Sequence, residues 1–321
     1  GSGEVTPPTM NGQASMKIGT RGSPLALWQA NEVKRRLHQA HPDLPDEAVE
    51  VVVITTTGDR IRDRALASIG GKGLFTKEIE EALAAGEIDM AVHSMKDMPT
   101  VLPDGMEICC LLPREDPRDA FICNVAEGIA GLPHGAVVGT ASLRRQAQVL
   151  HRRPDLKVIT FRGNVATRLE KLDRGEVAAT FLANAGLIRL QRTERITALI
   201  EPEEMLPAVA QGAVGVEIRS DDEATRARLA ALHDSETEYA VTAERAMLAA
   251  LDGSCRTPIA GLGLRQADGE LWLRAEIVMP DGSDRRATER RGPVSDAFCM
   301  GDDAGKQLKR DAGPAFLAEI F

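Results

Sequence analysis

Short runs rich in β-branched residues alternate with stretches of helical periodicity from Lys17 to about residue 233. Most runs are followed by a polar turn and then by a stretch with apolar residues at helical spacing. The runs lie at residues 16–19, 49–55, 89–92, 136–138, 157–161 and 178–182. This alternation is typical of parallel strands joined by crossover helices. The sequence therefore predicts an α/β fold with doubly wound, parallel sheets.

Three of the expected helices are preceded by a residue that can cap them. Ser23 stands before Pro24, a residue favoured at the first helical position, and Ser142 and Asn164 stand before two later helices. Gly175 follows the last of these helices, where a glycine commonly ends one. The local signals thus agree with the strand–turn–helix pattern.

Two segments indicate how the chain is divided. Segment 111–119, rich in proline and acid, looks like a crossing from one α/β unit to another, and the apolar, glycine-rich segment 206–217 can return the chain to the first unit. Hinged folds with two lobes often cross over in this way. We expect an extension at 1–15, a first domain at 16–112 and 211–232, and a second at 113–210.

After residue 233 the pattern of elements changes. A helix at 236–251 leads to alternating runs at 259–264 and 271–278 and then to a final helix near 305–320. That order is typical of a small α+β domain. The expected fold is therefore α/β, with two doubly wound lobes and a smaller α+β C-terminal domain at 233–321.

Positive charge is concentrated in the second of these lobes. Residues 140–192 contain eleven Lys or Arg against four Asp or Glu, a local balance of +7, whereas the whole chain carries −9. Guanidinium groups bind carboxylates and phosphates through two parallel hydrogen bonds, so we expect an anionic ligand. The pI near 5.3 and the 3% of aromatic residues argue against a nucleic-acid binder.

The arginines of this block follow the carboxyl ends of predicted strands, where ligands bind in open α/β sheets. Arg144 and Arg145 follow Thr140 and Ser142 into a helix, Arg162 and Arg168 flank the next turn, and Arg21 and Ser23 repeat the arrangement in the first lobe. Two facing lobes would then offer hydroxyls, amides and guanidinium groups to one cleft. The alternative is that Ser23 and Ser142 only cap helices.

An acid and an amine stand side by side after another predicted strand. In the run 93–99, Lys96 precedes Asp97, and a carboxylate at a strand's carboxyl end can stabilise a developing cation and move protons. The alternative is a surface ion pair. His93 in the same run is expected to be a packed histidine rather than a base.

A glycine-rich stretch and a cysteine turn complete the candidate features. The segment 70–73 contains Lys72 and forms either a basic lid or a plain flexible loop; it lacks the Ser or Thr of a nucleotide-binding loop. Cys255 lies in a tight turn beside Arg256, which favours a thiolate, although alone it is a weak signal. The five cysteines show no CxxC spacing, so we expect free thiols, no disulfide framework and no metal site.

No stretch of the sequence resembles a membrane span or a signal peptide. We therefore expect a cytoplasmic protein without a membrane or nucleic-acid partner. Nothing in the sequence suggests an apolar interface, so we also expect a monomer.

The same residues, in the same order, resemble the porphobilinogen deaminase family, also called hydroxymethylbilane synthases, of tetrapyrrole and heme biosynthesis. The resemblance runs from Lys17 to the C-terminus. It rests on segments 20–26, 70–75, 93–99, 114–120, 139–146, 162–168, 207–215 and 253–258. Ser68 is a departure, because some relatives have a lysine there.

The resemblance implies two lobes like those of periplasmic binding proteins and a smaller domain that presents a cysteine to the cleft. Cys255 matches the residue that holds a dipyrromethane cofactor through a thioether, and Asp97 matches the catalytic aspartate. Four porphobilinogen molecules would condense on this primer with loss of ammonia, and hydrolysis would release hydroxymethylbilane. The residues implied in binding cofactor or substrate are Arg21, Ser23, Gln29, Lys72, Phe75, Ser94, Lys96, Thr140, Ser142, Arg144, Arg145, Arg162, Arg168, Arg189 and Gln211.

The rival interpretation is a non-catalytic, two-lobed binding protein for a small polycarboxylate. It accounts for the lobes and for the arginines. It gives no role to Asp97 or to Cys255.

Overall fold

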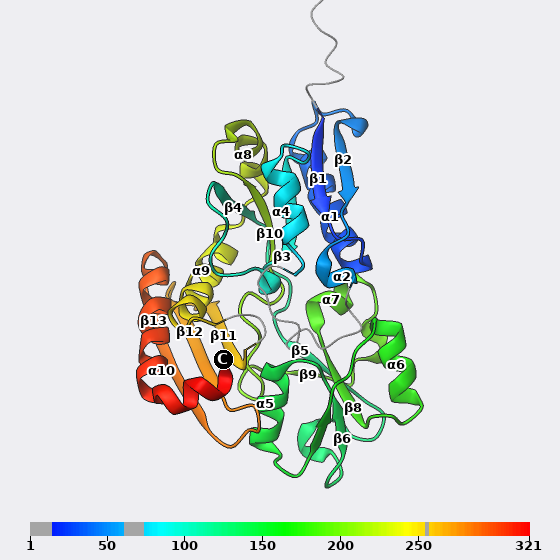
Figure 1. Ribbon diagram of the computed structural model, residues 1–321, viewed down its shortest axis with the longest axis vertical. Coiled ribbons are helices and arrows are strands. Elements are labelled where there is room, and N and C mark those ends of the chain that lie inside the picture. Colours follow the sequence, from blue (N-terminus) through cyan, green and yellow to red (C-terminus); the bar gives the residue numbers. More distant parts are fainter. Residues whose placement is uncertain (1–14, 61–73, 254–256) are drawn as a thin grey trace, which may run out of the picture.

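The first of three sheets lies in the upper part of Figure 1. The computed structural model describes residues 15–60, 74–253 and 257–321. The strand order of this sheet is β2-β1-β3-β10-β4. Its strands are β1 (Met16–Thr20), β2 (Val49–Val53), β3 (Met90–Ser94), β4 (Met106–Leu111) and β10 (Val214–Arg219). The helices of this part are α1 (Pro24–Ala40), α2 (Thr57–Arg60), α4 (Lys77–Ala84) and α8 (Glu223–Leu229).

The second sheet, green in Figure 1, has the order β7-β6-β8-β5-β9. Its strands are β5 (Asp119–Cys123), β6 (Val137–Gly139), β7 (Lys157–Ile159), β8 (Ala179–Ala183) and β9 (Ala198–Ile200). The helices of this part are α5 (Leu143–Arg152), α6 (Val165–Asp173) and α7 (Asn184–Arg189). The six strand positions expected from the sequence are all confirmed, with shifts of a few residues at their ends.

Both sheets are mixed, because antiparallel strands join the parallel strands that the sequence predicts. β1 is parallel to β2 and β3, but β10 runs antiparallel to both β3 and β4. In the second sheet, β5 runs antiparallel to β8 and β9. The chain reaches β5 and β10 by crossing between the two sheets rather than through a crossover helix, so nothing forces these strands to run parallel.

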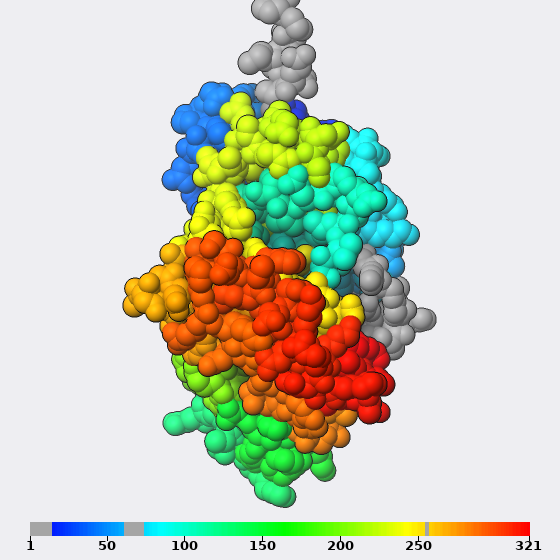
Figure 2. All heavy atoms as spheres, turned by 90° about the vertical axis from the view of Figure 1, so that its left-hand side faces the viewer, coloured from blue at the N-terminus to red at the C-terminus, as the bar shows by residue number. Residues whose placement is uncertain are grey.

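A third, smaller sheet has the antiparallel order β11-β12-β13 and packs on two helices. Its elements are α9 (Ser235–Ala250), β11 (Ile259–Arg265), β12 (Leu271–Val278), β13 (Arg285–Gly292) and α10 (Ala297–Ile320). Helix α10 begins earlier than the sequence suggested. It is kinked at Gly313, which has a φ of 78° and stands directly before Pro314. In Figure 2 this part, orange to red, lies against both the cyan and the green parts of the chain.

The helix caps expected from the sequence are present. The Ser23 side chain accepts a hydrogen bond from the Ala26 N–H, and Ser142 accepts one from the Arg145 N–H. Asn164 caps α6 in the same way through the Thr167 N–H. These caps fix where α1, α5 and α6 begin relative to the strand ends before them.

The core of the C-terminal part extends into the first lobe. Met95 and Met98, which follow β3, belong to the same buried cluster as Val241, Met247 and Ile259. The turn after β3 is therefore held between the two parts. Within the described ranges, no helix combines the length and apolar character that a membrane span requires.

Candidate active site

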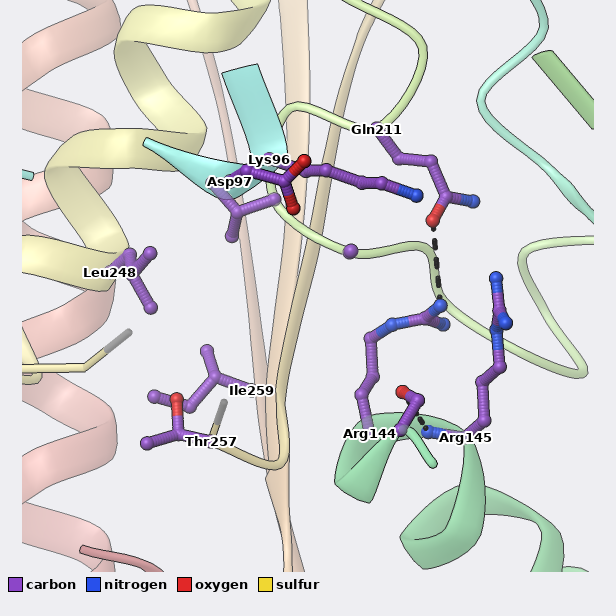
Figure 3. A pocket seen from close by; sticks show the side chains of 11 residues that line it. Lys96, Asp97, Arg144, Arg145, Gln211, Leu248, Thr257 and Ile259 are labelled. Carbon is purple, nitrogen blue, oxygen red and sulfur yellow. Dashed lines mark hydrogen bonds between the residues drawn. The ribbon is translucent and has the colours of Figure 1, made fainter. Parts of the chain in front are cut away.

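A cavity of about 170 Å³ lies where the turn after β3, the start of α5 and the start of β11 approach one another (Figure 3). The returning segment before β10 closes one wall and α9 another. The lining residues are Lys96, Asp97, Ser142, Arg144, Arg145, Ala208, Val209, Gln211, Leu248, Thr257 and Ile259. Residues from all three sheet-containing parts thus meet around one space.

Asp97 ends a single 3-10 turn, η3 (Met95–Asp97), directly after β3. The Met95 N–H donates to the Ala213 carbonyl at 2.9 Å, which ties this turn to the segment before β10. On the other side, Arg245 of α9 donates to the carbonyl oxygens of Met98 and Pro99, at 3.1 and 2.7 Å. The turn that carries the acid is therefore fixed from two directions.

Lys96 extends from the same turn towards Gln211, opposite the guanidinium groups of Arg144 and Arg145 (Figure 3). Burial lowers the pKa of the Lys96 ammonium, and Arg145 and Arg144 lower it further, while Asp97 and Asp119 oppose that effect. Burial is the main cause of this shift, and Arg145 and Arg144 are the cations that contribute to it from the same side of the cavity.

The two arginines at the start of α5 share one carboxylate. Arg144 Nη1 donates to Asp119 Oδ2 at 2.7 Å, and Arg145 Nη2 donates to Asp119 Oδ1 at 3.0 Å. Gln211 joins them, because its Nε2 donates to Asp119 Oδ1 at 2.9 Å. Despite complete burial, these cations hold the pKa of Asp119 far below its ordinary value. With Lys96, three cations face two carboxylates, so the cavity keeps a net positive charge.

The positive charge continues to Arg162 and Arg168 beside α6. Burial lowers the pKa of the Arg168 guanidinium to about 10, and the neighbouring Arg145 and Arg162 contribute to that shift. Among the described residues, Arg145 Nε and Arg162 Nε are buried and have no hydrogen-bond partner. Buried N–H groups normally have an acceptor. This cluster therefore fits a ligand that carries several carboxylates.

A second, smaller cavity of about 30 Å³ shares Asp97 with the first. Phe75 lines it beside Arg21, whose guanidinium carbon lies 4.1 Å from the Phe75 ring centroid. Arg21 is also paired with Asp59, with a shortest N–O distance of 2.5 Å. Gln29 and Ser94 exchange hydrogen bonds of 3.0 and 3.2 Å on another wall.

The remaining predicted residues that the structure describes lie at different places around the two cavities and at the junction of the lobes. Thr140 accepts a hydrogen bond from the Ser142 N–H at 3.1 Å, next to the first cavity. Arg189 of α7 donates to the Gly212 carbonyl at 2.9 Å and lies over the Trp28 ring of α1. It thus bridges the two lobes. Ser23 caps α1.

Lys72, Ser68 and Cys255 lie outside the described residues. Residues 254–256 are not described, and Thr257, the first described residue after them, lines the wall of the first cavity. Before the gap, Gly253 is packed so closely that an added Cβ would lie 2.4 Å from an Ile259 methyl group.

Comparison with known proteins then decides the family. A family model described as "Porphobilinogen deaminase, dipyromethane cofactor binding domain" matches residues 16–227, and one described as "Porphobilinogen deaminase, C-terminal domain" matches residues 238–310. The porphobilinogen deaminase of Paracoccus denitrificans (strain Pd 1222) is 58% identical over 95% of this chain and 97% of its own length. The chain belongs to the porphobilinogen deaminase family.

Other members are similar over comparable lengths. The chloroplastic porphobilinogen deaminase of Oryza sativa subsp. japonica is 55% identical over 95% of this chain and 86% of its own length. Among solved structures, a periplasmic substrate-binding protein of an ABC transporter from Coxiella burnetii overlaps 70% of this chain and 94% of its own, with a TM-score of 0.42 and 13% identity. The sheet topology, and not this overlap, defines the fold.

The described residues fit the cofactor of the porphobilinogen deaminase family. A dipyrromethane consists of two linked pyrroles that each carry carboxylate arms, so it needs several cationic or N–H donors. The excess of cations around Arg144 and Arg145, and the buried Nε groups without acceptors, supply that chemistry. The residues that would hold it lie on the second lobe, opposite Asp97.

Sequence reasoning missed three features of this site. Asp119 stands within the segment 114–120 that carries the family resemblance, yet its neighbours in the chain give no sign of its role. The part of Arg245 in holding the Asp97 turn had no local signal, because its partners are carbonyl groups far away in the sequence. The pairing of His93 with Glu217 was also hidden by sequence distance.

Proposed function

We propose that this chain condenses four porphobilinogen molecules head to tail on a covalently held dipyrromethane primer and releases ammonia at each step. Hydrolysis then frees linear hydroxymethylbilane for tetrapyrrole and heme biosynthesis. The observation that carries the proposal is the position of Asp97, whose carboxylate lines a cavity with Lys96, Arg144 and Arg145. Such a cavity can hold the carboxylates of a pyrrole while it presents an acid to the ring.

Asp97 is the proposed catalytic residue. Porphobilinogen becomes a cation when its aminomethyl arm loses ammonia, and the positive charge spreads to the ring nitrogen. A fixed carboxylate beside that nitrogen stabilises the cation more than it stabilises the uncharged ring. The clamp of Arg245 on the following residues supports this role, because it holds the turn without using the Asp97 carboxylate.

The arginines are proposed to bind the acetate and propionate arms. Arg144 and Arg145 keep one positive charge beyond what Asp119 neutralises, and Arg162 and Arg168 add two more along α6. Charge-assisted hydrogen bonds to carboxylates are about twice as strong as neutral ones. Each added ring brings further carboxylates, so a row of cations suits a chain that lengthens.

The remaining proposed contacts lie around the second cavity and at the domain junctions. They are Arg21, Ser23, Gln29, Lys72, Phe75, Ser94, Thr140, Ser142, Arg189 and Gln211. Of these, Gln211 contacts both Asp119 and Arg144 and so couples the returning segment to the arginine pair.

Cys255 is the proposed attachment point of the primer. When bound there through a thioether, the dipyrromethane supplies the pyrrole carbon to which the first substrate is joined. Leu248 and Ile259 provide an apolar wall of the cavity, opposite the arginines (Figure 3). This arrangement would pack ring carbons against aliphatic groups and turn carboxylates towards guanidinium groups.

We also propose the division into domains at 16–112 with 211–232, 113–210 and 233–321, which agrees with the membership of the three sheets. We propose a monomer, because the large apolar residues exposed on the described surface, such as Val101, Val125 and Phe298, are scattered. A cytoplasmic location agrees with the free thiols of the described cysteines.

The function is tested with the Asp97→Asn variant, prepared in a form that carries the dipyrromethane primer. An amide keeps the shape of the side chain but not its charge, so we expect turnover of porphobilinogen to fall on the order of 100-fold, with folding and primer content unchanged. The matched control is Asp104→Asn, an exposed acid in the loop after the same turn. A polycarboxylate-binding protein would bind porphobilinogen without forming product in either form, and that result would overturn the proposal.

A further inference from the structure

Three ionisable residues form a buried group behind the Asp97 turn. His93 of β3 lies against Glu217 of β10, with 2.9 Å between His93 Nε2 and Glu217 Oε1. Glu80 of α4 covers the same pair from the helix side. The three side chains are almost fully buried, and Glu217 has no exposed surface.

The two carboxyl groups of this cluster must share a proton. Glu80 Oε2 and Glu217 Oε2 are buried without a donor from the described residues. Two facing carboxylates without a donor repel each other strongly, whereas one shared proton joins them by a hydrogen bond. Burial and the facing Glu217 raise the pKa of Glu80 to about 8, and burial also raises the pKa of Glu217.

His93 connects this pair to the reaction space. Its ring lines the cavity of about 30 Å³ that Asp97 also lines, together with Ser94 and Arg21. Burial lowers the pKa of the His93 imidazole to about 4, although Glu80 and Asp97 oppose that shift. The ring is therefore neutral, and it can pass a proton from one nitrogen to the other without staying charged.

We propose that His93, Glu217 and Glu80 form a proton store that serves Asp97 during each condensation. The inference rests on the proposed function. His93 faces the cavity and exchanges the proton, and Glu217 and Glu80 act through it as positioning residues.

Each condensation releases as many protons as it consumes. The C–N bond of protonated porphobilinogen breaks, and ammonia leaves with the electron pair. The ring carbon of the bound chain forms the new C–C bond and then loses its hydrogen as a proton. That proton passes by way of Asp97 to His93, which gives its Nε2 proton to Glu217. The store later returns one proton to ammonia, which leaves as ammonium.

The store itself is tested by infrared spectroscopy of the purified holoprotein, independently of turnover. At pH 7 we expect the carbonyl band of a buried protonated carboxyl group, which disappears on alkaline titration with a midpoint near 8. A variant with both Glu80→Gln and Glu217→Gln should lack the band, because neither carboxyl group remains, and Glu81→Gln, an exposed neighbour on α4, should keep it. Absence of the band from the wild type, or its persistence in the double variant, would overturn the proposal.

Kinetics test whether the store serves the reaction. Glu217→Gln and His93→Gln keep a polar side chain at each position but break proton transfer, so kcat should fall on the order of 100-fold with KM and primer mass unchanged. Glu81→Gln should behave as the wild type. Unchanged kcat in both variants, in a wild type that makes product, would exclude the store while leaving the proposed function intact. A wild type that makes no product would contradict the proposed function instead.

Discussion

Asp119 accepts a hydrogen bond of 2.7 Å from Arg144, and both side chains are almost fully buried. The same carboxylate accepts a bond from Arg145, so one acid organises two of the cations that line the first cavity. Without it, two buried guanidinium groups would face each other uncompensated. The acid thus sets both the geometry and the net charge of the cavity.

Replacement of this acid should be costly. We expect Asp119→Asn to lower the free energy of unfolding by about 3–5 kcal/mol, the usual effect of removing one partner of a buried ion pair. Urea denaturation measures the loss. Asp221→Asn changes an exposed acid and serves as the control. Equal stabilities of the two variants would mean that Asp119 does not hold the arginines in solution.

Arg168 should matter for binding rather than for folding. Burial, together with the neighbouring cations Arg145 and Arg162, lowers the pKa of its guanidinium, so removing it relieves repulsion while losing a contact to ligand carboxylates. We expect Arg168→Leu to raise KM for porphobilinogen about 10- to 100-fold, the range of a lost charged hydrogen bond. Arg174→Leu, an exposed neighbour paired with Glu176, should leave KM unchanged. The same KM in both variants would contradict the role of Arg168.

Arg245 should affect turnover through the position of Asp97. Arg245→Met keeps the aliphatic stem but leaves the Met98 and Pro99 carbonyl groups without these donors. Because small displacements of a reacting group lower the rate of the chemical step strongly, we expect kcat to fall at least about tenfold with little change in KM. Arg228→Met, at an exposed ion pair with Asp43, is the control. A kcat equal to that of the control would show that the turn holds its position without Arg245.

The stability of the fold should depend on pH in a defined window. Glu80 has a pKa of about 8 in the fold against 4.5 in the unfolded chain, so between these values the folded state holds the extra proton and stability falls as pH rises. His93 has the opposite shift, from 6.5 down to about 4, and offsets that slope below pH 6.5.

The net loss of stability should therefore appear between about pH 6.5 and 8, at no more than about 1.4 kcal/mol per pH unit for one proton. Denaturation midpoints across this range measure it. Glu80→Gln should flatten the slope, because an amide does not titrate. An unchanged slope in that variant would assign the pH dependence to other groups.

The local parts of this fold could be read from the sequence. Capping residues such as Ser142 and Asn164 mark where helices begin, and the arginines at strand ends meet at one edge because parallel strands end together. These signals depend on neighbours in the chain. They predict that the arginines of the second lobe meet at one sheet edge, whereas the approach of Asp97 depends on how the two lobes face each other.

The rest depends on partners that are far apart in the sequence. The antiparallel insertion of β10 between β3 and β4 leaves no local signal, and neither does the pairing of Glu217 with His93 or of Asp119 with Arg144. Sequence patterning therefore identified Asp97 and the cations of the site, but not Asp119, the buried acid that pairs with Arg144 and Arg145.

The measurement that tests the central claim most directly is the mass of the purified wild-type protein, combined with mapping of its peptides. The proposed primer predicts an intact mass greater than that of the polypeptide by one dipyrromethane group, with the whole addition on the peptide that contains Cys255. A Cys255→Ala variant should carry no addition and form no hydroxymethylbilane. A wild-type protein that is unmodified and yet converts porphobilinogen would contradict the account.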